Sequence, residues 1–406
     1  MNYILLIIIF FLKNNKSNKR EFIKRMSLYT IITLLMSVSI FLIYETNAIV
    51  TLNNRRSHLD KVCYTGFWLI LLIMVMLCDD RSPDYRAYKV IFGFSPSGID
   101  FSSFYYSSQL HTEIGWKFLG NIFKTMGISF EWFIAIVCGF SFLMLNKFIV
   151  NYCNENKSLS LFWLYGSFCL AYYYIGLRMG LAISIFLGIL LPLLEKKKYI
   201  KYFLGVLICT TFHTVSILYA LLIFVEKIDL NKIKKMLIIC VAIGIGVMIT
   251  GTNDIIYMFI PTSVTSSLGY GLSVSENYPL YQLIYRLLFL LVSLYCYYMM
   301  EGEGKPEMEV SYKCYFAGMM FYLIFSSVPI LGTRVFDMVK PLETIFVCKA
   351  IGSRKRKFLS GRLLFLVSLL LCLFMVFYHI NAIKGYFIET SNYSFYSFPF
   401  RSIIDR

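Results

Sequence analysis

Long apolar runs that each hold a single basic residue constrain the fold of this chain more than any other feature. Arg178 is the only charged residue between Leu159 and Leu194, in a stretch otherwise apolar enough for a membrane. The same pattern recurs around His213, Arg286 and Arg334. An arginine at the centre of a bilayer costs at least about 2.5–3.5 kcal/mol, so such residues are kept where they face a partner or a wet cavity. Since few acids lie nearby in the sequence, we expect the partner to be an anionic ligand.

The composition places the chain among polytopic membrane proteins. Hydrophobic residues make up 58% of it and charged residues 15%, whereas soluble domains average about a quarter charged. A spanning helix needs about 20 mostly apolar residues, so we predict an all-α polytopic membrane protein with about 11–12 transmembrane helices. The predicted helices lie near 27–44, 62–78, 129–150, 159–175, 177–194, 203–225, 236–252, 280–300, 314–329, 335–351 and 361–379.

The domain organisation follows from the absence of long polar stretches between these runs. We predict one membrane-embedded domain over residues 26–406. Residues 1–25 have two interpretations, because lysine and arginine lie on both sides of the span 27–44. Either translation starts at Met26, or Met1–Leu12 lies in the membrane interface and the charge rule is broken there.

Lysine-rich loops give the orientation and reveal a parity problem. Basic residues cluster in three short loops, at 196–201, 227–235 and 354–357. Short loops rich in Lys and Arg mark the cytoplasmic side, and a simple span at 203–225 would place the first two on opposite sides. We therefore expect a re-entrant hairpin that breaks near Thr210–Thr214, with His213 at its tip facing outside; irregular backbone at membrane depth is tolerated where it lines a cavity. With the basic loops inside, loops 79–116 and 253–279 are predicted to be extracytoplasmic.

The net charge of +16 and the eleven cysteines have simple explanations. The cations gather in short loops as topology determinants and do not form a face for nucleic acid. The cysteines include no CxxC pair, and most lie in apolar runs, where cysteine behaves as a small hydrophobe. No P-loop or GxGxxG motif occurs in the sequence. We predict no cofactor and no metal site.

An ordered set of short motifs runs through the chain. In chain order these are D-Y-R-A-Y with Asp84, Tyr85 and Tyr88, E-I-G from Glu113 to Gly115, Arg178 opening a small-residue helix, His213 in an apolar segment, G-T-R ending at Arg334, and the aromatic tail N-Y-S-F-Y-S-F-P-F. In order and spacing this set resembles the EpsG family of Wzy-type polymerases, which make exopolysaccharide, capsule or O-antigen. The resemblance spans residues 26 to 404.

The resemblance implies a GT-C-like membrane glycosyltransferase. Its substrates would be oligosaccharide repeat units linked to undecaprenyl pyrophosphate. The enzyme would move the growing chain from one lipid carrier onto another, at the outer face of the bacterial cytoplasmic membrane. A chain-length regulator and other polysaccharide assembly proteins would be its partners, besides the lipid bilayer itself.

The isolated arginines fit this chemistry. Arg178, Arg334 and Arg286 would bind the pyrophosphate, because a guanidinium group matches phosphate oxygens well. The alternatives are snorkelling of Arg178 and Arg334 to the interface and a structural role for Arg286. Tyr85 and Tyr88 would contact the substrate, as the resemblance implies.

His213, Asp84 and Glu113 are the candidates for a catalytic base. Pyrophosphate leaves without protonation, so one base for the acceptor hydroxyl suffices. A neutral imidazole near pH 7 is a natural proton acceptor, which favours His213. The alternatives are a packing role for His213 and plain solvation for the two carboxylates.

Two other functions stay open at this point. One is an O-antigen ligase-like or acyl transfer enzyme that acts on glycans. The other is a flippase or transporter of lipid-linked sugars. Transporters often carry inverted repeats, and no second half mirrors the first here, so we favour the polymerase.

Three further charges fall along the predicted span 335–351. Asp337, Lys340 and Glu343 are spaced at i, i+3 and i+6. Residues at this spacing share one helix face, so we expect them to pair with one another, with Pro341 kinking the helix.

Overall fold

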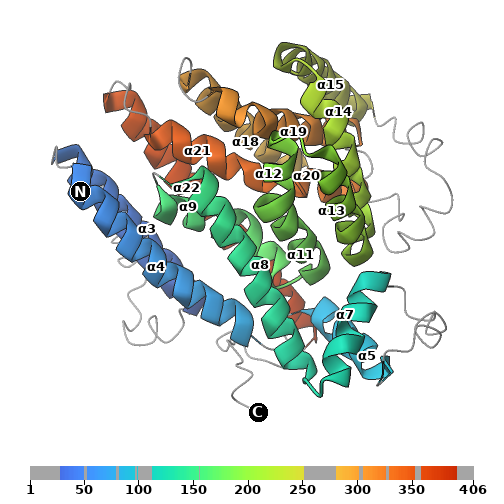
Figure 1. The fold of residues 1–406 in the computed structure, drawn as a ribbon. Coiled ribbons are helices and arrows are strands. Elements are labelled where there is room, and N and C mark those ends of the chain that lie inside the picture. Colours follow the sequence, from blue (N-terminus) through green and yellow to red (C-terminus); the bar gives the residue numbers. More distant parts are fainter. Residues whose placement is uncertain are drawn as a thin grey trace.

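The elements of the chain are helical throughout its described part (Figure 1). The computed structural model describes residues 28–49, 53–78, 82–96, 98, 112–154, 156–250, 280–300, 305–325, 329–352 and 358–390. The α-helices are α3 (Leu28–Ile49), α4 (Asn53–Leu77), α5 (Pro83–Phe94), α7 (Ile114–Thr125), α8 (Phe130–Tyr152), α9 (Lys157–Leu164), α10 (Leu170–Tyr172), α11 (Leu177–Ile185), α12 (Leu191–Glu195), α13 (Tyr199–Phe212), α14 (Leu222–Lys227), α15 (Leu230–Thr250), α18 (Leu280–Met299), α19 (Lys305–Ile324), α20 (Pro329–Asp337), α21 (Glu343–Gly352) and α22 (Phe358–Thr390). Two π-helical turns, η1 (Tyr165–Cys169) and η2 (Phe186–Leu190), and two 3₁₀ segments, η3 (Thr214–Leu221) and η4 (Lys340–Leu342), complete them.

Several of these helices have the length and composition of membrane spans. Four are long and apolar enough to cross a bilayer: His58–Leu77, Phe130–Tyr152, Leu177–Glu195 and Arg362–Ile380. Three shorter apolar helices accompany them: Thr30–Glu45, Tyr199–Phe212 and Leu283–Met299. The prediction of an all-α polytopic membrane protein is therefore confirmed.

The segment 203–225 forms the predicted hairpin. Helix α13 ends at Phe212, and His213 has an extended backbone, with φ −149° and ψ 113°, before η3 begins. The Tyr202 hydroxyl donates to the Tyr219 carbonyl at 2.7 Å, and the Tyr199 hydroxyl donates to the Glu226 carboxylate at 2.8 Å. A straight helix would hold the second pair about 40 Å apart at 1.5 Å per residue, so the chain must turn back at His213.

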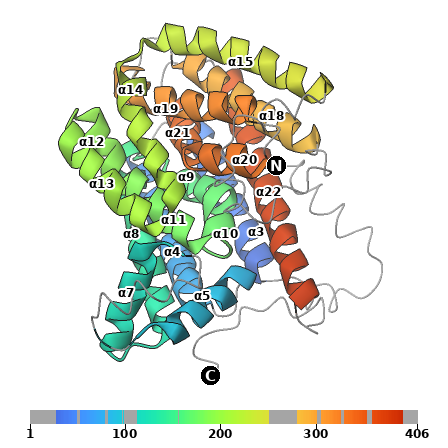
Figure 2. The same ribbon diagram turned by 90° about the vertical axis from the view of Figure 1, so that its right-hand side faces the viewer.

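The hairpin also resolves the parity problem. Lys197, two residues before α13, lies 3.7 Å from Glu226 in α14, so the basic clusters that flank the hairpin meet at one end of the molecule. Helix α15 lies at one end in both views, and α5 and α7 lie at the opposite end, beside the tip of the hairpin (Figures 1 and 2). The predicted cytoplasmic and outer ends are thus well separated.

Three short helices lie where the sequence patterns predict loops or turns. Helix α5 and the start of α7 lie within the predicted outer loop 79–116, and α20 covers the connection between the predicted helices 314–329 and 335–351. Helix α5 has clear local signals: the Ser82 hydroxyl accepts the Tyr85 N–H at 3.2 Å, and Pro83 and Asp84 occupy the first turn. Capping serine, an early proline and an early acid all favour a helix start. These helices are too short to span a membrane, so long apolar runs in the sequence do not reveal them.

The predicted span 335–351 is divided rather than continuous. Helix α20 ends at Asp337, and η4 carries Pro341 before α21 begins at Glu343. Proline removes a helical hydrogen bond, which accounts for the break. The expectation that Asp337, Lys340 and Glu343 pair along one helix face is corrected, because their hydrogen bonds go to side chains of other helices.

Several predictions lie outside the described residues. They concern residues 1–25, the loop 253–279, the basic cluster 354–357 and the aromatic tail after 390.

Candidate active site

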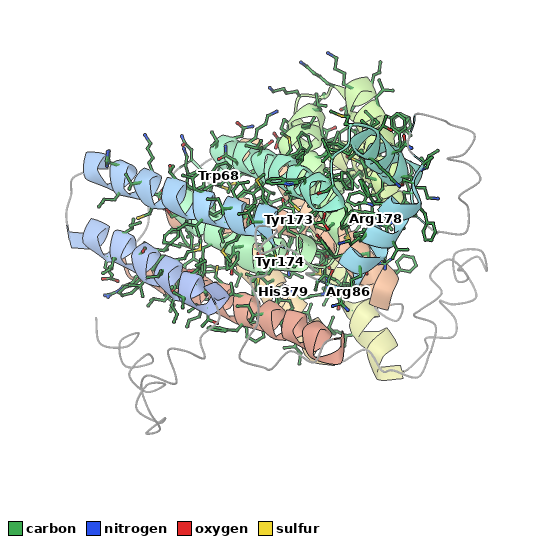
Figure 3. The ribbon with its side chains drawn as sticks, turned by 90° about the horizontal axis from the view of Figure 1, so that it is seen from below. Trp68, Arg86, Tyr173, Tyr174, Arg178 and His379 are labelled. Atoms are coloured by element: carbon green, nitrogen blue, oxygen red, sulfur yellow. The ribbon has the colours of Figure 1, made fainter. Side chains whose placement is uncertain are left out.

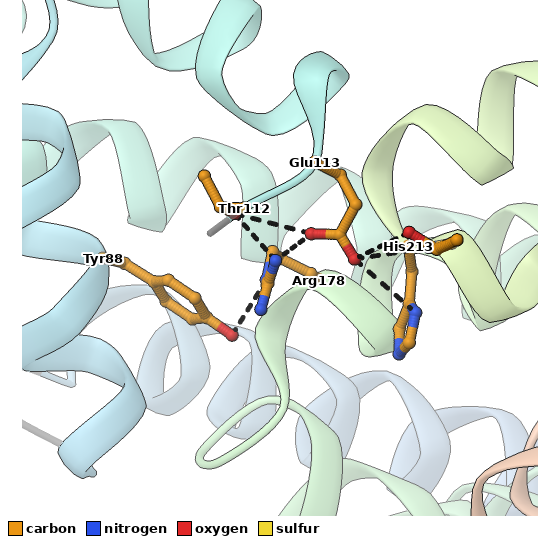
Figure 4. A network of polar contacts seen from close by, with 6 residues as sticks. Tyr88, Thr112, Glu113, Arg178 and His213 are labelled. Carbon is orange, nitrogen blue, oxygen red and sulfur yellow. Dashed lines mark hydrogen bonds and ion pairs between the residues drawn. The ribbon is translucent and has the colours of Figure 1, made fainter. Parts of the chain in front are cut away.

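Arg178 is held in place at the point where a central helix is interrupted. Helix α10 ends at Tyr172, a turn follows, and α11 begins at Leu177, so that Arg178 lies in its first turn. The guanidinium Nε donates to the Tyr88 hydroxyl at 3.2 Å (Figure 4). Nη1 donates to the Thr112 hydroxyl at 2.7 Å and forms an ion pair with Glu113. These bonds engage Nε and Nη1 and leave Nη2 without a bond to the described residues.

Glu113 connects Arg178 to the tip of the hairpin. It precedes α7 as the N-cap residue, and one carboxylate oxygen accepts from Arg178. The other oxygen accepts the Thr214 backbone N–H at 3.3 Å and lies 3.9 Å from His213 Nδ1 (Figure 4). Three segments far apart in the sequence, around 113, 178 and 213, therefore converge on one carboxylate.

Gly115 allows α7 to approach the hairpin closely. A Cβ atom at this position would lie 2.8 Å from the Thr211 carbonyl oxygen and still closer to the Thr211 side chain. Real Cβ atoms do not approach backbone oxygens this closely, so any side chain here would push α7 away from α13. The glycine of the E-I-G motif thus lets Glu113 reach the hairpin tip.

His213 lies largely buried at the tip of the hairpin. Its side chain is 14% exposed, and its Nδ1 atom is buried without a hydrogen-bond partner among the described residues. Buried polar atoms are usually hydrogen-bonded, so an exception calls for an explanation such as a ligand or a catalytic role. Glu113 is the acid that faces this atom.

Arg334 and Asp84 complete the cluster. Arg334 lies in the last turn of α20, is exposed, and has no ion-pair partner among the described residues. It acts electrostatically on Asp84, Tyr88 and His213, as does Arg178. The structure therefore brings together two arginines, two acids and the histidine predicted from the sequence. Viewed from below, Arg178 lies close to α5, the helix that carries Asp84 and Arg86 (Figure 3).

The two groups on α5 respond to this environment in the same direction. Desolvation raises the pKa of the Tyr88 phenol above its ordinary value, and Arg178 opposes the change. Desolvation also raises the pKa of the Asp84 carboxyl, and Arg178 and Arg334 oppose it. Because Asp84 is exposed, solvent screens these effects more strongly there than at Tyr88.

Tyr85 and Tyr88 face the protein interior. Tyr85 is 1% exposed and packs edge-on against Phe130, with ring centres 5.0 Å apart. Tyr88 is 4% exposed and packs against Trp116. Stacking on a sugar requires an open ring face, so Tyr85 lies in a packing position, whereas Tyr88 orients Arg178 through its hydroxyl.

Arg286 lies in a separate, more deeply buried cluster. It donates to Asp337 at 3.3 Å, and only 8% of its side chain is exposed. The guanidinium carbon lies 4.4 Å from the ring centre of Tyr322 and 5.1 Å from that of Phe336. The expectation that the isolated arginines lack acidic partners is corrected for both Arg178 and Arg286, because Glu113 and Asp337 reach them from distant parts of the chain.

Three polar residues of these clusters were not identified from the sequence. In the cluster around Arg178, the Thr112 hydroxyl accepts from Arg178 and the Thr214 backbone N–H donates to Glu113. In the cluster around Arg286, the Tyr172 hydroxyl donates to Asp337 at 2.5 Å. Thr112 and Thr214 directly adjoin Glu113 and His213, and Tyr172 precedes the turn to Arg178. Their position next to a motif residue could have identified them from the sequence, whereas a threonine or tyrosine by itself does not indicate a site.

The described residues contain no group of three or more His, Cys, Asp or Glu side chains that could hold a metal ion. All eleven cysteines are free thiols, and ten of them are buried. The cluster around Arg178 therefore offers guanidinium groups, carboxylates and an imidazole as its chemical groups. Such a set binds anions and transfers protons.

Comparison with known protein families identifies the family of this chain. The EpsG family model matches residues 63–398 of the 406-residue chain. No curated protein and no solved structure gives a significant match. The matched region contains every residue of the cluster around Arg178.

Proposed function

Because the chain belongs to the EpsG family, a family of polysaccharide polymerases, we propose that it joins lipid-linked oligosaccharide repeat units into a surface polysaccharide. The donor in this proposal is a growing glycan on undecaprenyl pyrophosphate. The acceptor is the non-reducing sugar of another lipid-linked unit. The reaction is a glycosyl transfer, and the leaving group is the lipid pyrophosphate.

The observation that carries the proposal is the convergence of Arg178 and Arg334 beside His213. The Nη2 group of Arg178 forms no hydrogen bond with the described residues. Arg334 is exposed and has no ion-pair partner among the described residues. Both guanidinium groups can therefore meet an anion that approaches the end of the molecule opposite the lysine-rich loops. A pyrophosphate has several oxygens in the geometry that guanidinium forks match.

The chemical step assigns one task to each group. The acceptor hydroxyl oxygen attacks the anomeric carbon of the donor, and the bond from that carbon to the pyrophosphate oxygen breaks. The electron pair leaves with the pyrophosphate, whose growing negative charge Arg178 and Arg334 stabilise. The hydroxyl proton passes to His213.

Glu113 supports His213 in this scheme rather than replacing it. Glu113 is engaged in the ion pair with Arg178, so the proposal does not assign the base to it. It lies 3.9 Å from His213 Nδ1, where it stabilises the positive charge that the imidazole gains. Asp84 forms no such ion pair with the described residues and is the second candidate for the base.

We also propose a subcellular location and protein partners for this chain. The multi-pass protein would lie in the bacterial cytoplasmic membrane with its active site at the outer face. It would work with a chain-length regulator and other polysaccharide assembly proteins. The positive-inside rule and the family support this arrangement.

Glycan chain-length analysis in a deletion strain tests the proposed function. We expect the wild-type gene to restore long polymer, and Arg178→Lys and Arg334→Lys to yield single repeat units at unchanged protein level. Lysine keeps the charge but loses the planar fork. Arg362→Lys is the matched control, because Arg362 forms an ion pair with Glu45, at 3.1 Å, outside the site. Polymer of normal length from both site variants would refute the proposal.

Cysteine labelling tests the orientation. The native cysteines give little background, since ten of the eleven are buried. With a membrane-impermeant reagent on intact cells, we expect Ile114→Cys to be labelled and Lys197→Cys to be labelled only after lysis. Ile114 is 60% exposed beside Glu113 and so reports on the site itself. The reverse pattern would place the site in the cytoplasm.

A further inference from the structure

The buried cluster around Arg286 touches both helices that carry the site arginines. Asp337 is its centre: one carboxylate oxygen accepts from Arg286 at 3.3 Å, and the other accepts from the Tyr172 hydroxyl at 2.5 Å. Asp337 ends α20, three residues after Arg334. Residues three apart are neighbours on a helix surface, so fixing Asp337 also fixes the turn that presents Arg334.

Tyr172 connects the same carboxylate to Arg178. It ends α10, directly before the turn that leads into α11. The first turns of α11 pack tightly on it: a Cβ atom at Gly180 would lie 3.0 Å from the Tyr172 carbonyl oxygen. The Tyr172 hydroxyl therefore ties α20 to the element against which the Arg178-bearing helix rests.

We infer that Asp337, through its bonds to Tyr172 and Arg286, is a positioning residue that fixes Arg334 relative to Arg178. The inference rests on the proposed function, because it concerns the spacing of the two guanidinium groups that meet the pyrophosphate. It also gives Arg286 a role different from direct substrate contact. Arg286 bonds to the Asp337 carboxylate oxygen that Tyr172 does not use, and its guanidinium packs against the rings of Tyr322 and Phe336.

The charge and burial of the cluster fit a positioning role. Asp337 is 15% exposed and Arg286 8%, so the pair is largely withdrawn from solvent. Buried, hydrogen-bonded ion pairs are geometrically demanding, and they specify one arrangement of the elements that carry them. An anion site formed by two arginines requires a rigid support of this kind, because misplacing a catalytic group by about 1 Å is enough to lose much of the reaction rate.

Binding of undecaprenyl pyrophosphate without sugar, measured on the full-length protein in nanodiscs, tests the inference. We expect Tyr172→Phe to weaken binding about tenfold, since a hydrogen bond to a charged group is lost. Tyr315→Phe is the matched control: its hydroxyl donates to the buried Glu343 carboxylate at 2.8 Å, away from α20. We expect that control to bind like the wild type. Equal weakening by both substitutions would overturn the inference.

A double-mutant cycle separates positioning from general stability. If Tyr172 acts through Arg334, Tyr172→Phe should weaken binding less than about twofold in an Arg334→Lys background. A full tenfold loss in that background would show that the effect does not pass through Arg334. If Tyr172→Phe fails to fold, Asp337→Asn takes its place in the same cycle, because it keeps the side-chain shape.

The same data distinguish this inference from the proposed function. Wild-type affinity in Arg178→Lys and Arg334→Lys would overturn the anion site itself, and the inference with it. Loss of affinity in those variants, together with wild-type affinity in Tyr172→Phe, would overturn the positioning role alone.

Discussion

The clusters around Arg178 and Arg286 look alike in sequence and differ in structure. Each is a single arginine in an apolar run, and each meets an acid from a distant segment. The Arg178 side chain is 24% exposed, with Arg334 and His213 beside it, whereas Arg286 is 8% exposed and packs against two aromatic rings. The difference teaches that an isolated membrane arginine identifies a polar site but not its purpose. Exposure, and a second arginine without an ion-pair partner among the described residues, distinguish the proposed binding site from the proposed support.

A third ion pair extends the comparison to the surface. Lys89 in α5 lies 2.7 Å from Glu131 in α8, and 42% of its side chain is exposed. The three pairs therefore form a series from buried to exposed. Removing one partner should lower the free energy of unfolding most at the buried pair and least at the exposed pair. The loss of polymer should instead be largest at Arg178.

The largest expected effect concerns His213, because the proposed function makes the cluster around Arg178 a reaction centre rather than a second structural pair. His213→Gln keeps hydrogen bonding but cannot accept a proton at neutral pH. We expect chain extension by purified protein to fall about 10²–10⁴-fold, the usual contribution of a general base. Binding of the lipid-linked repeat unit should persist. Near-wild-type extension would move the base to Asp84.

The second prediction compares the two arginines directly. Arg286→Ala leaves Asp337 as a buried charge that has lost its ion pair, and this should cost about 3–5 kcal/mol of stability. Arg178→Ala leaves Glu113 near solvent and should cost less than about 2 kcal/mol while abolishing polymer. Denaturation of both variants in detergent, followed by circular dichroism, gives the two values. Equal losses of stability would remove the distinction between support and site.

The third prediction concerns the approach of α7 to the hairpin. Gly115→Ala places a Cβ atom 2.8 Å from the Thr211 carbonyl, which displaces Glu113 from His213. We expect polymer yield to fall about tenfold at normal protein level, because catalytic groups tolerate little displacement. Gly93→Ala in α5 is the control, since a Cβ atom there meets nothing within 4 Å. Unchanged polymer from Gly115→Ala would show that Glu113 need not approach the hairpin this closely.

The smallest effect is expected at the surface pair. Lys89→Met should change stability by less than about 1 kcal/mol and leave polymer length unchanged, because exposed ion pairs contribute little. The same detergent denaturation measures it. A loss comparable with that of Arg286→Ala would contradict the ordering by exposure.

Much of the fold could be read from the sequence because membrane helices obey a simple physical rule. Backbone groups in lipid must be satisfied within the segment, so long apolar runs can only be helices. The hairpin at 203–225 followed from a charge argument about Lys-rich loops, and the backbone break at His213 agrees with it. Short helices such as α5 and α20 were missed, because their signals are caps and amphipathic spacing rather than length.

The sequence by itself determined the helical class and the hairpin, and it singled out the charged residues of the proposed site. The tertiary structure alone decided which of them meet. Glu113 lies 65 residues from Arg178, and Asp337 lies 51 residues from Arg286. A charge in an apolar run shows that burial has a free-energy cost at that position. The residue that offsets the cost depends on how the helices pack, which local sequence does not show. For that reason the same sequence signal produced an open arginine site at one position and a closed structural pair at the other.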